Sequence, residues 1–81
     1  MKILQTNYEN LVFYAGQPVI DRGISHWDIE HDGNWLTVYS TNKTGLFKVE
    51  SVLGTFTRAI NEEIAFINYF QNKYTKTFTS S

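Results

Sequence analysis

Apolar and polar side chains alternate most regularly between residues 26 and 50. Such alternation is typical of β-strands, because successive side chains of a strand point to opposite faces of the sheet. Asp32-Gly33 interrupts the pattern and suits a two-residue type I′ turn, in which both central residues need positive φ. A hairpin about this turn pairs Trp27 with Val38, so we predict two antiparallel strands here.

A second turn, at Asn42-Lys43, extends the hairpin into a three-stranded meander and is expected to place Val38 opposite Phe47 and Leu36 opposite Val49. The apolar face then collects Trp27, Ile29, Leu36, Val38, Phe47 and Val49. The opposite face collects His26, Asp28, Glu30, Trp35, Thr37, Tyr39, Leu46, Lys48 and Glu50. A slip of one residue would mix the two sets, so the agreement of both turns supports the assignment of the faces.

The C-terminal part predicts one long helix, from about Ser51 to about Tyr74, with Ser51 as its cap. Apolar residues follow a spacing of three to four: Leu53, Phe56, Ile60, Ile64, Ile67, Phe70 and Tyr74, widened by Ala59, Phe66 and Tyr69. Residues 54–57 are poor helix formers, so a start at about residue 57 is an alternative, and a strand over 52–57 is another. We expect the helix to lie across the apolar face of the sheet, since each covers the other.

The first quarter of the chain predicts further strands. Residues 2–5 suit a short strand, and residues 11–14 and 18–20 are β-prone segments on either side of a tight turn at Gly16-Gln17. That turn would pair Tyr14 with Val19. The chain therefore predicts an α+β domain over residues 1–74, with an antiparallel sheet of four or five strands and one C-terminal helix, followed by a disordered tail at 75–81.

Composition narrows the function. A chain of 81 residues without cysteine forms one small domain with neither disulfides nor a catalytic thiol, and its 16% aromatic content can fill a core. A net charge of −1 argues against a general phosphate-binding surface. No segment resembles a signal peptide or a membrane span, so we expect a cytoplasmic protein that does not contact membranes.

No motif for catalysis or for a cofactor is present, and we expect no enzyme activity, no cofactor and no metal. His26 and His31 are five residues apart on one strand and point to opposite faces, so they cannot share a metal ion. His26, Asp28 and Glu30 do share a face, and in principle could hold a divalent cation. A solvated outer surface explains the same residues without a ligand.

The face that carries Trp35 and Tyr39 is the predicted binding surface, because tryptophan and tyrosine are enriched in the centres of interfaces. Its candidate contact residues are Trp35, Tyr39, Leu46, Thr37, Lys48, Asp28, Glu30 and His26. We expect another protein as partner, with this chain as an adaptor, inhibitor or regulatory subunit of the kind that phages and mobile elements encode. A homodimer through this face, or through Phe66 and Tyr69 on the helix, is a further option.

Two alternatives stay open. Trp35 and Tyr39 could instead stack the bases of single-stranded nucleic acid, although the acids around them and the single lysine, Lys48, disfavour phosphate. The N-terminal strands could also fold over this face and bury Trp35 in a second core.

Overall fold

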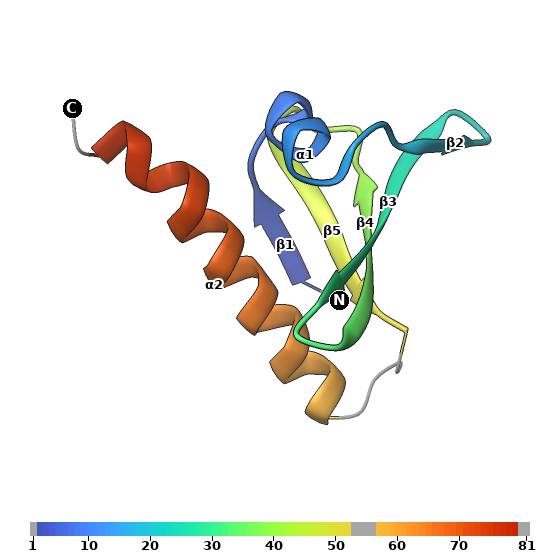
Figure 1. Cartoon of the computed structure of the whole chain (residues 1–81). Coiled ribbons are helices and arrows are strands. Elements are labelled where there is room, and N and C mark those ends of the chain that lie inside the picture. The colour runs from blue at the N-terminus through green and yellow to red at the C-terminus, as the bar shows by residue number, and fades with distance from the viewer. Residues whose placement is uncertain (1, 53–56, 80–81) are drawn as a thin grey trace.

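A computed structural model of the chain describes residues 2–52 and 57–79, with side chains as far as Tyr74. The elements follow in the order β1 (Lys2–Gln5), α1 (Tyr8–Ala15), β2 (Val19–Asp21), β3 (Ile24–His31), β4 (Asn34–Ser40), β5 (Leu46–Ser51) and α2 (Thr57–Thr79). The strands form one antiparallel sheet in the spatial order β1-β5-β4-β3-β2 (Figure 1). The predicted α+β class is confirmed, with five strands and a C-terminal helix packed against the sheet, and α1 is an additional short helix.

The β3–β4 hairpin has the predicted register. Asp32 and Gly33 adopt φ values of 56° and 81°, as a type I′ turn requires, and Trp27 lies opposite Val38. The backbone N–H of Gly33 donates a 2.9 Å hydrogen bond to Oε2 of Glu30. The turn is therefore supported both by its backbone geometry and by a side chain from β3.

The β4–β5 register differs from the prediction by two residues. Val38 lies opposite Val49 rather than Phe47, and Leu36 lies opposite Ser51 rather than Val49. The last pair is Ser40 with Phe47, so the connection is longer than the predicted two-residue turn at Asn42-Lys43. Because side chains alternate with a period of two, a shift of two residues leaves every side chain on its predicted face.

The N-terminal segment forms α1 where the sequence predicts a strand. The side chain of Asn7 accepts a 2.7 Å hydrogen bond from the N–H of Asn10 and caps the helix, and Leu11 is buried in the core. The predicted pairing of Tyr14 with Val19 across Gly16-Gln17 is therefore wrong. β2 does form, but it pairs with β3, and Pro18 stands just before this edge strand.

Helix α2 begins at Thr57, so the later of the two predicted starts is confirmed and the start at Ser51 is wrong. Ser51 ends β5, and its N–H donates a 2.8 Å hydrogen bond to Oε2 of Glu63. Residues 53–56, on which most of the alternative strand falls, lie outside the described residues. The helix continues to Thr79, past its predicted end at about Tyr74.

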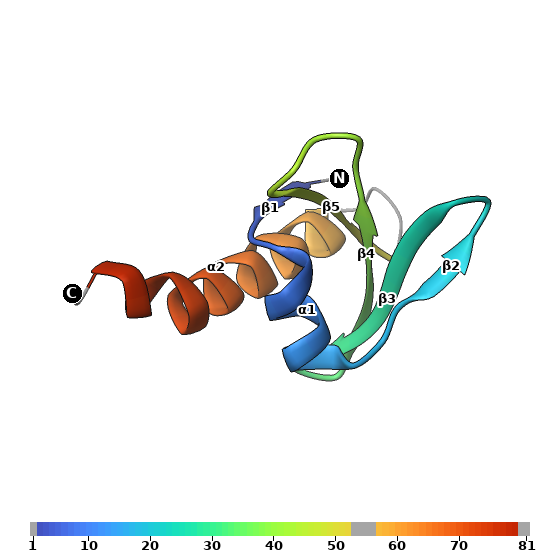
Figure 2. The same cartoon turned by 90° about the horizontal axis from the view of Figure 1, so that it is seen from above.

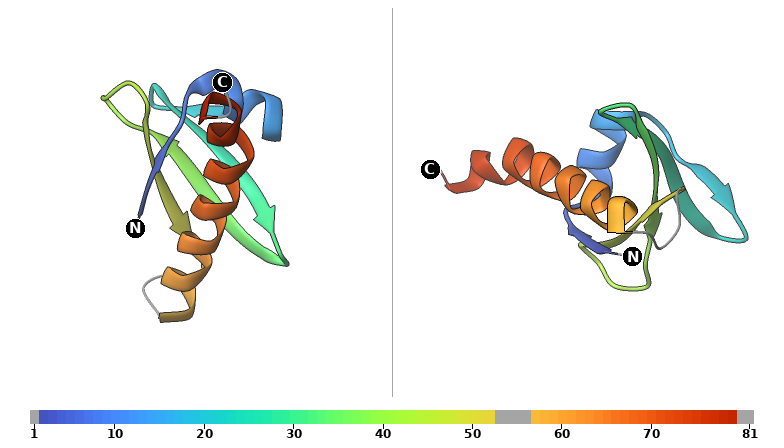
Figure 3. Two further views of the ribbon diagram at one scale, coloured as in Figure 1. Left: turned by 90° about the vertical axis from the view of Figure 1, so that its left-hand side faces the viewer. Right: turned by 90° about the horizontal axis from the view of Figure 1, so that it is seen from below.

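Both helices lie on the same side of the sheet, which leaves its other side uncovered in the part of the chain that the structure describes (Figures 2 and 3). The core joins the apolar sheet face to both helices through Leu4, Leu11, Trp27, Ile29, Leu36, Val38, Phe47, Val49, Phe66, Ile67 and Phe70. On α2 the buried face includes Glu63, whereas Ile64, predicted to be buried, is 39% exposed. Neither helix is both long and apolar enough, over the residues described, to cross a membrane.

Candidate binding face

The outer face of the sheet is the face opposite α1 and α2, and it carries all the side chains that the sequence placed there: His26, Asp28, Glu30, Trp35, Thr37, Tyr39, Leu46, Lys48 and Glu50. Trp35 is 54% exposed. β1 and β2 extend the sheet at its two edges instead of folding over this face. The alternative in which the N-terminal strands bury Trp35 is therefore wrong.

The strand register arranges the outer face in rows that cross the sheet. One row runs Ile3, Lys48, Tyr39, His26 and Val19, from β1 to β2. We call its central part, Lys48, Tyr39 and His26, the basic row. The next row consists of Glu50, Thr37 and Asp28 on β5, β4 and β3, and we call it the acidic row. Lys48 and Glu50 thus carry opposite charges in adjacent rows, two residues apart on β5. On β3 the same rows place His26 two residues from Asp28, and this pair carries opposite charges only when the imidazole is protonated.

Polar contacts hold the β3 side of this face. Nε2 of His26 lies 3.8 Å from Oδ2 of Asp28, and the hydroxyl of Thr37 donates a 3.3 Å hydrogen bond to the other oxygen, Oδ1. The His26 and Tyr39 rings are 6.0 Å apart between centroids. Glu30 is engaged with the β3–β4 turn. Across the described residues, no three His, Asp or Glu side chains gather closely enough to hold a metal ion.

His31 lies on the other side of the sheet from His26, as the sequence predicts. Its ring packs against Phe66 and Tyr69 of α2, with centroid distances of 5.6 and 5.0 Å. Phe66 is fully buried, so it does not belong to a spare apolar surface on the helix, whereas Tyr69 stays partly exposed. His31 therefore helps to join the sheet to α2.

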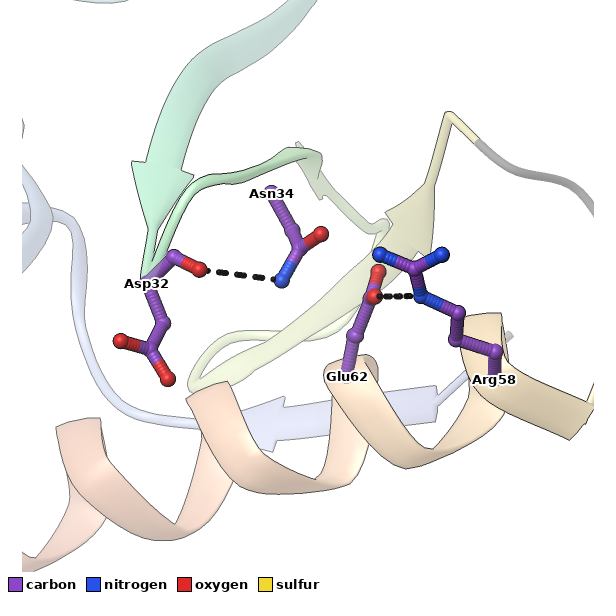
Figure 4. Close-up of polar contacts among 4 residues, drawn as sticks. All are labelled: Asp32, Asn34, Arg58 and Glu62. Atoms are coloured by element: carbon purple, nitrogen blue, oxygen red, sulfur yellow. Dashed lines mark hydrogen bonds and ion pairs between the residues drawn. The ribbon is translucent and has the colours of Figure 1, made fainter.

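A small pocket between the β3–β4 turn and α2 was missed by sequence reasoning. Its volume is about 170 Å³, and its lining includes Asp32, Asn34, Arg58 and Glu62 (Figure 4). Nε of Arg58 lies 3.1 Å from Oε2 of Glu62, and the amide of Asn34 donates a 3.2 Å hydrogen bond to the Asp32 carbonyl. The two turn residues are 24 to 30 positions away from the two helix residues and meet them only through the fold, so no local pattern could reveal the pocket.

Comparison of the chain with protein-family models, with curated proteins and with solved structures found no match.

Proposed function

We propose that this chain is a small, non-enzymatic protein-binding module that acts in the cytoplasm as an adaptor, inhibitor or regulatory subunit. The observation that carries the proposal is the exposure of Trp35 on a sheet face that neither helix covers. Tryptophan buries a large apolar area with little loss of side-chain freedom, and it is among the residues that contribute most to binding.

The roles of the other residues follow from their chemistry. Tyr39 adds a second aromatic ring on β4, the central strand of the sheet, and Leu46 adds an apolar side chain on the neighbouring β5. Lys48 and Asp28 are exposed charges that would form a polar rim. An aromatic centre bounded by charged and hydroxyl side chains is the usual anatomy of a protein interface. Thr37, His26 and Glu30 complete the proposed surface.

Single-stranded nucleic acid is the competing partner. Base stacking on Trp35 and Tyr39 would bring phosphates close to Asp28 and Glu50. Lys48 is the single lysine or arginine on the described outer face, so the charge balance there is acidic. The electrostatic term that drives nucleic-acid binding is therefore unfavourable.

Site-specific photo-crosslinking in the native host tests the proposal. A photoreactive aromatic residue in place of Trp35 should capture a protein, because the Trp35 side chain would lie within the interface. The matched control carries the same group in place of Asn72, an exposed residue of α2. Mass spectrometry identifies the products. Equal capture at both positions, or none at Trp35, would contradict the proposal.

A second measurement separates protein from nucleic acid. If the outer face binds only protein, the double variant Asp28→Lys with Glu30→Lys should not bind a labelled single-stranded oligonucleotide. Addition of this variant should then leave the fluorescence anisotropy of the oligonucleotide unchanged. The stacking function would be supported instead by two results together. The native chain would bind the oligonucleotide strongly and the double variant more tightly still, and the crosslinker at Trp35 would capture nucleic acid.

A further inference from the structure

The basic and acidic rows of the outer face make it complementary to itself. We infer that the partner of this face is a second copy of the chain, packed face to face about a two-fold axis. The inference rests on the proposed function, since it names the partner of the same surface. The positions of Lys48, Glu50, His26 and Asp28 in the sheet make the face self-complementary.

The two rows are adjacent, because their members are two residues apart on each strand, or about 6.7 Å. A rotation of 180° about an axis that runs between the rows, parallel to them and just above the sheet, exchanges them. Each residue then meets its neighbour on the same strand of the second copy. Lys48 lies over Glu50 of the second copy, and His26 lies over Asp28 of the second copy. Two-fold symmetry repeats both contacts.

Charge also selects this register over its neighbours. An axis placed above the basic row would bring Lys48 against Lys48 of the second copy, and one above the acidic row would oppose Glu50 to itself. Like charges in direct opposition at an interface are unfavourable. Of these axes, only the one between the rows pairs opposite charges, Lys48 with Glu50 on β5, and it places the imidazole of His26 against the carboxylate of Asp28 on β3.

The apolar residues fit the same arrangement. Trp35 lies one step beyond the acidic row on β4, and Leu46 lies one step beyond the basic row on β5. The rotation therefore brings Leu46 of the second copy next to Trp35, at both ends of the interface. Tyr39 lies over Thr37 of the second copy near the axis. Trp35 thus packs against the second copy at each end of the contact, and Tyr39 packs against it near the middle.

Sheet twist and interface size are compatible with this pairing. Sheets that pack face to face cross at about 30°. For a crossing point on β4, this angle displaces groups on β3 and β5, one strand or about 4.8 Å away, by only about 2–3 Å. A lysine side chain can span that displacement. Five strands and three two-residue steps give a footprint of roughly 19 by 20 Å on each copy, or about 760 Å² in total. This area is below the roughly 1,200 Å² of standard specific interfaces and belongs to the range of weak, transient contacts. The dimer should therefore dissociate within a measurable range.

Sedimentation of charge-reversal variants over a concentration series tests the inference. The native chain should dimerise, and Lys48→Glu and Glu50→Lys should each weaken self-association by about tenfold or more, because each replaces two attractive contacts with two repulsive ones. An equimolar mixture of the two variants should dimerise again, since both contacts then join Glu to Lys. The double variant should also dimerise. Lys73→Glu, an equal charge change on an exposed residue of α2, is the matched control and should have no effect.

Three results would overturn the inference: a native chain that stays monomeric, a dimer that neither charge reversal weakens, or a mixture that associates no better than the separate variants. Circular dichroism of each variant establishes that it is folded. The proposed function is judged separately by the crosslink at Trp35. Capture of a different protein there by a monomeric chain would overturn the second copy as partner while leaving the binding function intact.

Discussion

The two tryptophans of this chain have opposite environments. Trp27 is 2% exposed, and its indole N–H donates a 2.9 Å hydrogen bond to the carbonyl of Gly16. Trp35 is 54% exposed on the other face of the sheet. Their roles should therefore separate when each is truncated.

We expect Trp35→Ala to change the free energy of unfolding by about 1 kcal/mol or less, as for exposed cross-strand contacts. Trp27→Ala should cost about 3–5 kcal/mol, because it removes a buried ring and leaves a cavity. Urea denaturation of both variants measures the difference. A loss of several kcal/mol for Trp35→Ala would show that its ring belongs to the core and would remove the main aromatic contact residue of the proposed interface.

The burial of Glu63 on α2 could not be predicted from the sequence. The helical spacing of apolar residues predicts that Ile64 faces the sheet, but Glu63 is buried there and Ile64 is partly exposed. The Glu63 carboxylate accepts a hydrogen bond from the N–H of Ser51 at the end of β5. A buried carboxylate needs such a donor, and the donor comes from a strand twelve residues away. Periodicity on the helix alone carries no information about it.

At the scale of elements, alternation predicted the meander and its two faces correctly, because a buried face fixes the register to within an even number of residues. It could not fix the β4–β5 register. Asn42-Lys43 resembles a tight turn, but the connection there is held by Thr41, whose hydroxyl accepts a 3.1 Å hydrogen bond from the N–H of Lys43. Gly45 with φ of 86° then leads into β5.

Helix α1 shows the same limit. The sequence around Phe13 and Tyr14 is β-prone, yet it is helical because Asn7 caps the helix and Leu11 anchors it in the core. Packing outweighs the intrinsic preference, which spans only about 1 kcal/mol. The wrong prediction for residues 11–14 does not change the candidate binding face. β1 and β2 are edge strands of the sheet, so the residues of the meander still define its outer face.

The contact between α1 and α2 is an aromatic cluster centred on Tyr14. Its ring lies 5.3 Å from Phe70 and 6.4 Å from both Tyr69 and Tyr74, between centroids. Burial raises the pKa of the Tyr14 hydroxyl above its ordinary value of 10.0, and the nearby Tyr69, Tyr74 and Glu30 raise it further.

This shift makes part of the stability dependent on alkaline pH. Above pH 10 the tyrosine of the unfolded chain ionises first, so the unfolded state loses protons that the folded state keeps. The contribution of Tyr14 to stability is therefore complete below about pH 10 and is lost as the pH rises through the folded-state pKa. Tyr14→Phe should reduce this loss, as measured by the midpoint of urea unfolding on either side of pH 10. An unchanged alkaline slope in that variant would contradict the assignment.

At the scale of the whole molecule, a dimer formed by facing charged rows should respond to salt. Between about 0.1 and 1 M salt the Debye length falls from about 10 to about 3 Å, which screens charges at a partly solvated interface. We expect the dissociation constant of the native dimer to rise several-fold over this range in sedimentation experiments. The double variant Lys48→Glu with Glu50→Lys should show the same dependence, because its pairs are reversed and not lost. A dissociation constant that falls with salt would indicate an interface held by apolar contacts alone.

The edges of the sheet decide how far such assembly can go. β2 has three residues and follows Pro18, and β1 has four. Short edge strands and a neighbouring proline resist the addition of further strands, the route by which open sheets grow into fibrils. A face-to-face pair about a two-fold axis, in contrast, is closed and uses up its own binding surface. The short edge strands thus disfavour amyloid-like growth at the edges, and the proposed assembly through the outer face would end at two copies.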